Sequence, residues 1–126
     1  MQGRTQDKLK SDRGALNYQS GLAAEDIVRR HYQGRGAVML EQRWRGRAGE
    51  VDLIFRMSET LVFVEVKAAA SFRSAAERLT NAQIGRVALA AEEFTSSRAP
   101  TADIRIDAAL VDCRGCVDII ENITLA

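Results

Sequence analysis

Two neighbouring stretches with alternating apolar residues constrain the fold of this chain more than any other feature. Apolar side chains recur at Val51, Leu53 and Phe55, and valines occupy every second position of the stretch 61–67. Side chains that alternate in this way stand on opposite faces of a β-strand. Because only residues 57–60 link the two stretches, they predict an antiparallel hairpin with one face in a hydrophobic core.

The other predicted elements surround this hairpin. We expect helices over residues 20–33 and 81–97, the second one capped by Thr80 or Asn81, and further strands over residues 37–43, 103–112 and 116–123. Residues 1–16 carry little apolar periodicity and are expected to form a flexible N-terminal arm, so that residues 17–126 are the single folded domain. The order α-β-β-β-α-β-β predicts an α/β fold with a mixed β-sheet flanked by helices.

The composition is typical of one compact domain. The chain has 126 residues, of which 46% are hydrophobic and 28% charged. Its longest apolar run, residues 87–91, is far shorter than the roughly 18 residues of a membrane span, so we expect no membrane association. An export signal is not evident near the N-terminus and there are only two cysteines, which indicates a cytoplasmic protein.

The charge is distributed unevenly along the chain. Residues 1–50 carry a net charge of +4 and residues 51–126 a net charge of −3, and 15 of the 18 basic residues are arginine. Arginine favours bidentate contacts with phosphate, so the basic half indicates a nucleic-acid partner. A genome-wide codon bias toward arginine and alanine explains the same composition equally well.

The end of the hairpin carries side chains suited to metal chemistry. Glu65 and Lys67 share one face of the second strand, and a link centred between residues 58 and 59 pairs Asp52 near residue 65 or 66. Asp52 and Glu65 are then close neighbours, with α-carbons within about 5.5 Å if they pair directly. Carboxylate oxygens suit Mg²⁺ or Mn²⁺, and a lysine can hold a scissile phosphate or the attacking water. The alternative is an exposed hairpin end with an ordinary Glu-Lys pair.

Two further groups of residues are candidates for nucleic-acid binding. Three arginines and an aromatic residue precede the hairpin, and they could grip a phosphate backbone and stack on a base: Arg43, Trp44, Arg45 and Arg47. The alternative is a solvated loop with the tryptophan tucked into the core. Gln83, near the start of the second helix, could form a hydrogen bond to a phosphate or a water. A glutamine on a helix surface is, however, usually only solvated.

The remaining reactive side chains predict no site of their own. Cys113 and Cys116 form a single C-x-x-C pair at a predicted hairpin tip, whereas a structural zinc ion needs four ligands. We therefore expect two ordinary thiols. His31 lies on the first helix and is expected to be half-buried rather than a general base.

The hairpin also resembles that of a known family. The segments 49–54 (GEVDLI) and 62–67 (VFVEVK) are similar to the bacterial YraN family, endonuclease-like proteins related to Holliday junction resolvases. The wider group is the PD-(D/E)XK nuclease superfamily, whose restriction-endonuclease-like αβββαβ core agrees with the order of elements above. The resemblance extends over most of the chain, including residues 21–25, 44–45 and 105–107.

The resemblance implies a role for each matching residue. Asp52, Glu65 and the backbone carbonyl of Val66 would bind Mg²⁺ or Mn²⁺, Lys67 would be the catalytic lysine, and Glu25 matches an acidic residue of the first helix. The implied activity is metal-dependent hydrolysis of phosphodiester bonds in DNA, branched DNA included.

A second hypothesis is a non-catalytic nucleic-acid-binding module that retains the nuclease fold. It draws on two departures from the family pattern. Ala68–Ala70 stand where the family continues with threonine and arginines, and Asn81 and Gln83 stand where a proline and a basic residue are usual. The oligomeric state, monomer or homodimer, stays open.

Overall fold

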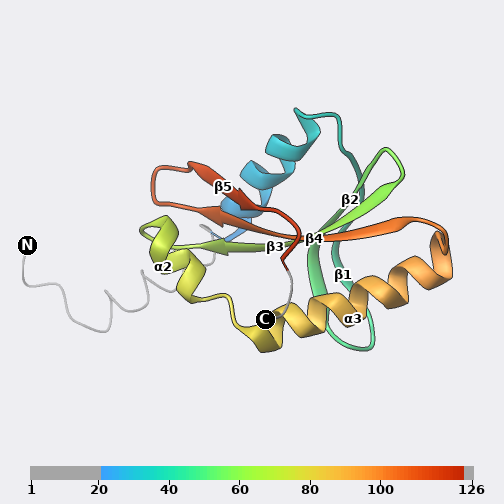
Figure 1. Cartoon of the computed structure of the whole chain (residues 1–126). Helices are drawn as coiled ribbons and strands as arrows, with labels where there is room; N and C mark the ends of the chain where they lie inside the picture. Colours follow the sequence, from blue (N-terminus) through green and yellow to red (C-terminus); the bar gives the residue numbers. More distant parts are fainter. Residues whose placement is uncertain (1–20, 124–126) are drawn as a thin grey trace, which may run out of the picture.

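The computed structural model of the chain describes residues 21–123, and the predicted arm over residues 1–16 lies outside them. In the described part a helix over residues 21–33 is followed by β1 (Val38–Arg45), β2 (Glu50–Met57), β3 (Thr60–Ala68), α2 (Phe72–Glu77), α3 (Asn81–Arg98), β4 (Asp103–Val111) and β5 (Val117–Ile120). Figure 1 shows these elements along the chain.

The strands form one five-stranded sheet in the order β1-β2-β3-β4-β5. β3 and β4 run parallel, and every other neighbouring pair is antiparallel. A parallel pair needs a crossover connection, which α2 and α3 supply here. The prediction of an α/β fold with a mixed sheet and flanking helices is therefore confirmed.

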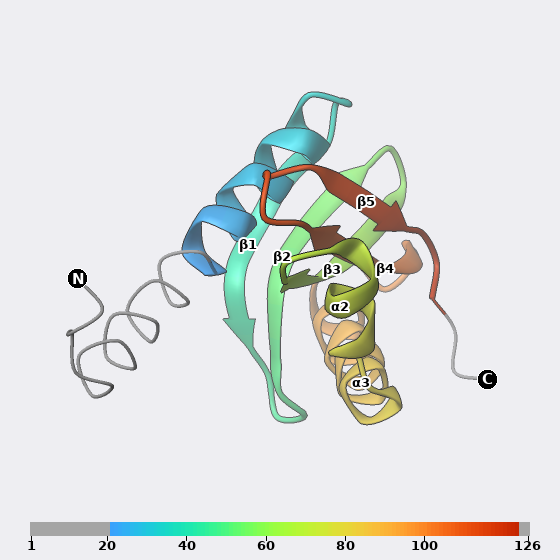
Figure 2. The ribbon, with the colours of Figure 1, turned by 90° about the vertical axis from the view of Figure 1, so that its left-hand side faces the viewer.

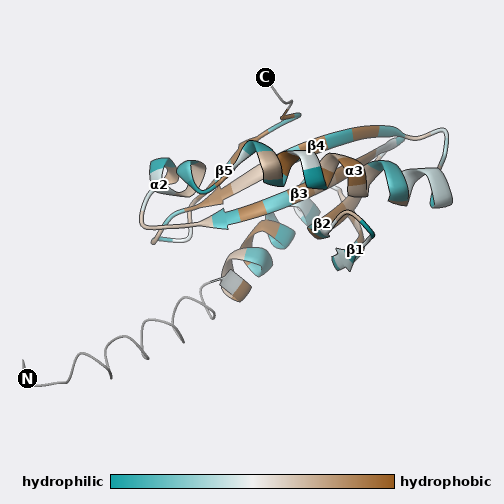
Figure 3. Ribbon diagram, turned by 90° about the horizontal axis from the view of Figure 1, so that it is seen from below, coloured by the Kyte–Doolittle hydropathy of each residue, from teal (hydrophilic) through white to brown (hydrophobic). Residues whose placement is uncertain are grey.

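Helices cover both faces of the sheet. The N-terminal helix packs Ala24, Val28 and Tyr32 on one face, and α3 packs Val87 and Phe94 on the other. Figure 2 shows these helices on opposite sides of the strands, and Figure 3 shows hydrophobic and hydrophilic segments alternating along β3 and β4. The core is thus split into two layers by the sheet. Within residues 21–123, no helix has the length and apolarity that crossing a lipid bilayer requires.

The central strand β3 is buried on both faces for its first half. Val62 and Val64 belong to the core under the N-terminal helix, whereas Leu61 and Phe63 belong to the core under α3. After Val64 the burial falls to intermediate, so the strand leaves the core at its C-terminal end. This is the pattern that the alternation predicts.

Two features differ from the sequence-based expectation. The short helix α2 was not predicted, because its six residues bury only Ala75 and so show no apolar period, although Ser71 caps it. Val51 was expected on the face of Leu53 and Phe55, but it packs into the core under α3. The regular pleat is interrupted opposite this point, where Arg43 of β1 has a φ of 52°.

Candidate functional site

Asp52 and Glu65 lie where the hairpin strands stop pairing. The backbone register of β2 and β3 runs from Met57–Thr60 to Leu53–Val64, and the next position would set Asp52 opposite Glu65, as the link length predicts. At this point a side chain replaces the backbone as the hydrogen-bond acceptor, because Oδ2 of Asp52 accepts a hydrogen bond of 2.8 Å from the Val66 N–H.

The two carboxylates open into one pocket between the sheet and α3. This pocket has a volume of about 210 Å³, and α3 contributes Gln83 and Arg86 to its lining. The two acids therefore share one face of the sheet and can act on one ligand. Glu50 and Val87 complete the lining.

The electrostatics of this pair depend on burial. Burial, together with the negative charges of Glu65 and Glu25, raises the pKa of Asp52 to about 7, while the hydrogen bond from Val66 opposes this rise. Burial also raises the pKa of Glu65, whereas the positive charge of Lys67 opposes that rise. Two acids with raised pKa values in one pocket indicate a site that favours an added positive charge.

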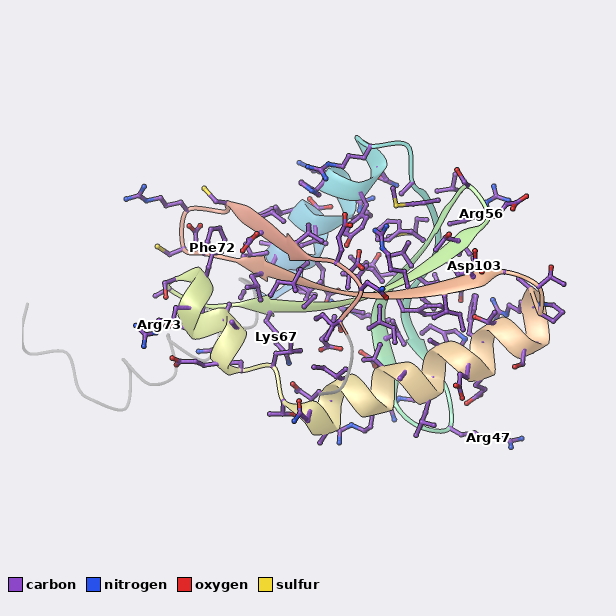
Figure 4. The ribbon with its side chains drawn as sticks, viewed as in Figure 1. Arg47, Arg56, Lys67, Phe72, Arg73 and Asp103 are labelled. Atoms are coloured by element: carbon purple, nitrogen blue, oxygen red, sulfur yellow. The ribbon has the colours of Figure 1, made fainter. Side chains whose placement is uncertain are left out.

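Lys67 lies beside this pair on the same strand. Its Nζ is 3.5 Å from Oε1 of Glu65, and the two side chains are only 17% and 15% exposed. In Figure 4 the side chain of Lys67 points from β3 toward the space between α2 and α3. The structure therefore brings Asp52, Glu65 and Lys67 together at one end of the hairpin.

Glu25 approaches the same end of the sheet from the N-terminal helix, but it is held by β1. Its Oε1 accepts a hydrogen bond of 3.0 Å from Nε of Arg43 and lies 3.5 Å from Nε2 of Gln42. Glu25 contributes charge to the environment of Asp52 without being among the residues that line the pocket. Its role in the site stays a prediction.

The predicted cluster of arginines and tryptophan is dispersed. Trp44 packs edge-to-face on Phe94, with ring centroids 5.2 Å apart, which favours the alternative of a ring tucked against the core. Arg45 is exposed and lies 4.0 Å from Glu50, next to the acidic pocket. Figure 4 shows Arg47 well away from Lys67, beyond α3. Arg45 therefore lies next to the pocket of the carboxylates, and Arg43 binds Glu25.

Sequence reasoning missed two cations, one in the pocket of the carboxylates and one in a separate pocket that Lys67 lines. Arg86 lines the pocket of the carboxylates, and Arg78, at the C-cap of α2, donates a hydrogen bond of 3.0 Å to the Ala68 carbonyl. Arg86 follows Gln83 by three residues, so helical spacing alone could have placed both on one face. Arg78 gave no such signal, because α2 itself was not predicted.

A divalent cation would find few ligands beyond the pair. In the described part of the chain, no three His, Cys, Asp or Glu residues are grouped as a metal site. Mg²⁺ is bound in many proteins by one or two carboxylates plus water and substrate oxygens, so the carboxylates of Asp52 and Glu65 would fit such an ion. The Val66 carbonyl stays a predicted ligand, because Val66 is not among the residues that line this pocket.

The fold and this site define a small α/β protein with an acidic pair and a lysine at the end of its central strands. The sequence profile of the "Uncharacterised protein family UPF0102", which is the YraN family, matches residues 24–111. The chain belongs to this family, as the hairpin motifs predicted.

Three relatives extend the match to most of the chain. A UPF0102 protein of Roseobacter denitrificans is 45% identical over 111 residues, which is 86% of both chains. Another, from Ruegeria pomeroyi, is 44% identical over 117 residues, 91% of this chain and 95% of its own. A third, from Dinoroseobacter shibae, is 42% identical over 120 residues, 94% of this chain and 90% of its own.

Proposed function

We propose that this protein is a metal-dependent nuclease that hydrolyses phosphodiester bonds in DNA. The observation that carries the proposal is the shared pocket of Asp52 and Glu65, which lies beside Lys67 and receives Gln83 and Arg86 from α3. A phosphodiester is anionic, and its hydrolysis develops further negative charge. An acidic pair that attracts a cation, with basic and amide groups around it, suits that substrate.

The donor set fits Mg²⁺ or Mn²⁺. The carboxylates of Asp52 and Glu65 and the carbonyl of Val66 are the hard oxygen ligands that these ions prefer. Burial and the nearby charge of Glu65 raise the pKa of Asp52, and a cation between the two carboxylates would offset both effects, which supports the same assignment. When bound, the ion supplies Lewis acidity toward the scissile phosphate.

The other side chains act on the phosphate and on water. The Lys67 ammonium donates to a non-bridging phosphate oxygen or orients the attacking water. The side-chain oxygen of Gln83 is held by the Thr80 N–H, so its NH₂ group stays available as a donor beside Arg86. In the reaction, the water oxygen bonds to phosphorus and the bond to the sugar oxygen breaks. The sugar oxygen receives the proton that the water gives up.

A non-catalytic nucleic-acid-binding module is the second candidate function. The alanines at Ala68–Ala70 favour it, because they leave the strand after Lys67 without further cations or hydrogen-bonding side chains. The two functions differ in metal-dependent cleavage.

The test is incubation of the purified protein with branched, duplex and single-stranded DNA in the presence of Mg²⁺ or Mn²⁺. We expect cleavage by the wild type and none by Asp52→Asn. Asp103→Asn is the matched control, because Asp103 is an exposed aspartate at the opposite end of the sheet in Figure 4, and it should cleave like the wild type.

Thermal unfolding separates metal binding from chemistry. A bound ion stabilises the folded state by linkage, about 2.7 kcal/mol at a concentration 100 times Kd, so Mg²⁺ or Mn²⁺ should raise the Tm of the wild type but not of Asp52→Asn. Lys67→Ala removes a cation next to the metal site, so its Tm shift should persist while cleavage falls. If no ion shifts the Tm and no DNA is cut, the nuclease proposal is wrong and the binding module gains support.

A further inference from the structure

A second and larger pocket opens on the other side of Lys67. It has a volume of about 490 Å³ and shares no lining residue with the pocket of the two carboxylates. Its described walls come from the end of β3, from the segment after it, from the C-cap of α2 and from the β4–β5 turn: Gly21, Val66, Lys67, Ala68, Ala69, Ala70, Arg78 and Cys113.

The charge of this pocket favours an anion. Lys67 and Arg78 line it, and the described lining includes neither aspartate nor glutamate. Arg78 is fixed by its hydrogen bond of 3.0 Å to the Ala68 carbonyl, while its exposed side chain keeps further N–H donors. Lys67 also keeps N–H donors beside its ion pair with Glu65, so the end of β3 and the C-cap of α2 each bring one cation to this pocket for a phosphate group.

The size of the pocket follows from the alanines. Ala68–Ala70 present only methyl groups, where longer side chains would fill the space beside Lys67. The resulting volume lies in the range of about 300–1,000 Å³ that is typical of small-ligand pockets. A concave site of this kind can receive a single nucleotide, but a base held in a duplex must first leave its stack, which costs a few kcal/mol.

We propose that this pocket binds one unpaired nucleotide of the substrate strand, with its phosphate on Lys67 and Arg78. The inference rests on the proposed function, and it names the substrate class as DNA that has a single-stranded segment next to the cut. Ala68–Ala70 then have a positive role, because they make room for the nucleotide.

Cys113 provides a direct reporter of occupancy. Both cysteines are free and exposed, but Cys113 lines this pocket and Cys116 does not. In the Cys116→Ser variant only Cys113 reacts with iodoacetamide, and in Cys113→Ser only Cys116 reacts. The two variants form a matched pair that distinguishes filling of the pocket from a general effect of the ligand.

The experiment measures the alkylation rate of each variant, without metal, against thymidine monophosphate, thymidine and inorganic phosphate. We expect millimolar thymidine monophosphate to slow alkylation of Cys113 several-fold in a saturable manner and to leave Cys116 unaffected. Thymidine should protect far less. Protection by phosphate equal to that by the nucleotide would overturn the nucleotide assignment, and absence of saturable protection would overturn the site.

Two substitutions test the walls of the pocket. Arg78→Gln removes a cation from an exposed position, and Ala70→Leu fills space at an exposed position, so both should fold with the Tm of the wild type. Both should lose the protection of Cys113 by thymidine monophosphate, when each is combined with Cys116→Ser. Protection that survives in both variants would overturn the proposal.

The outcome is independent of the cleavage test. Asp52→Asn should abolish cleavage and keep the protection of Cys113, because Asp52 does not line this pocket. Metal-dependent cleavage without protection of Cys113 would refute the nucleotide pocket but would support the proposed nuclease function. Protection without cleavage of any DNA would refute the nuclease and leave a nucleotide-binding pocket.

Discussion

Asp107 joins three parts of the molecule through one buried carboxylate. It is fully buried, and it accepts hydrogen bonds from the Tyr32 hydroxyl at 2.6 Å, from the Arg105 guanidinium at 2.8 and 3.0 Å, and from the Asn122 N–H at 3.0 Å. Burial, together with the bond to Asp107, raises the pKa of the Tyr32 hydroxyl, which therefore stays a donor. The N-terminal helix, β4 and the segment after β5 are thus held together at one point.

Removal of this carboxylate should destabilise the fold strongly. Asp107→Ala leaves the Arg105 guanidinium and the Tyr32 hydroxyl without their acceptor, and we expect a loss of about 3–5 kcal/mol in the free energy of unfolding. Tyr32→Phe removes one hydrogen bond to a charged group and should cost about 1.5–3 kcal/mol. Urea unfolding measures both. Asp118→Ala, at an exposed position of β5, is the control, and an equal effect there would contradict the prediction.

The environment of His31 predicts that the free energy of unfolding depends on pH. Its Nε2 is buried and has no partner among the described residues, and burial, with the charge of Arg35, lowers its pKa below the usual 6.5. The unfolded chain then binds a proton more readily than the folded chain, so the free energy of unfolding falls as pH drops through 6.5. His31→Gln should weaken this dependence between pH 7 and 5 in urea unfolding. A slope equal to that of the wild type would exclude His31 as its source.

At the scale of elements, the start of α3 connects stability to the site. Thr80 caps the helix in a reciprocal arrangement, in which its hydroxyl accepts from the Gln83 N–H at 3.1 Å and the Gln83 side chain accepts from the Thr80 N–H at 3.2 Å. The same first two turns carry Gln83 and Arg86 to the pocket of the carboxylates. The cap therefore orients side chains that the proposed chemistry uses.

Loss of the cap should have a measurable cost. Thr80→Ala leaves the Gln83 N–H without its side-chain acceptor and should lower the free energy of unfolding by about 0.5–2 kcal/mol. Thr80→Ser keeps the hydroxyl and should restore most of that loss. Thermal and urea unfolding of the three proteins measure the effect, and equal stability of the alanine and serine variants would show that the hydroxyl contributes nothing.

At the scale of the whole molecule, we expect DNA binding to depend steeply on salt. Each phosphate that a basic side chain neutralises adds about 0.7 to the slope of log affinity against log salt for single-stranded DNA. Arg45 is 80% exposed and lies beside the acidic pocket. Arg45→Ala should therefore weaken binding and reduce the slope by about 0.7, the contribution of one phosphate contact.

The control for this prediction is another exposed arginine. Arg56 lies at the far end of the hairpin in Figure 4, and Arg56→Ala should leave both affinity and slope unchanged. Fluorescence anisotropy with labelled single-stranded DNA across a salt series measures both quantities. A flat salt dependence for the wild type would show that the basic half of the chain reflects composition alone.

The sequence by itself determined the central hairpin and its register. Alternation with a period of two and a short link are local properties, so they placed Asp52 close to Glu65 and kept Lys67 on the face of Glu65 without knowledge of the rest of the fold. The helical period likewise located α3 and limited its cap to Thr80 or Asn81, and the structure shows the cap at Thr80. These features need only the geometry of one strand or one helix.

Only the tertiary structure decided what surrounds the acidic pair. Arg86 and Arg78 reach the two pockets because the crossover between the parallel strands β3 and β4 lays α2 and α3 along the sheet, and no local pattern encodes that placement. Trp44 packs on Phe94, 50 residues later, for the same reason. Contacts between distant segments depend on how whole elements pack, so the cations of the site became visible only in the folded molecule.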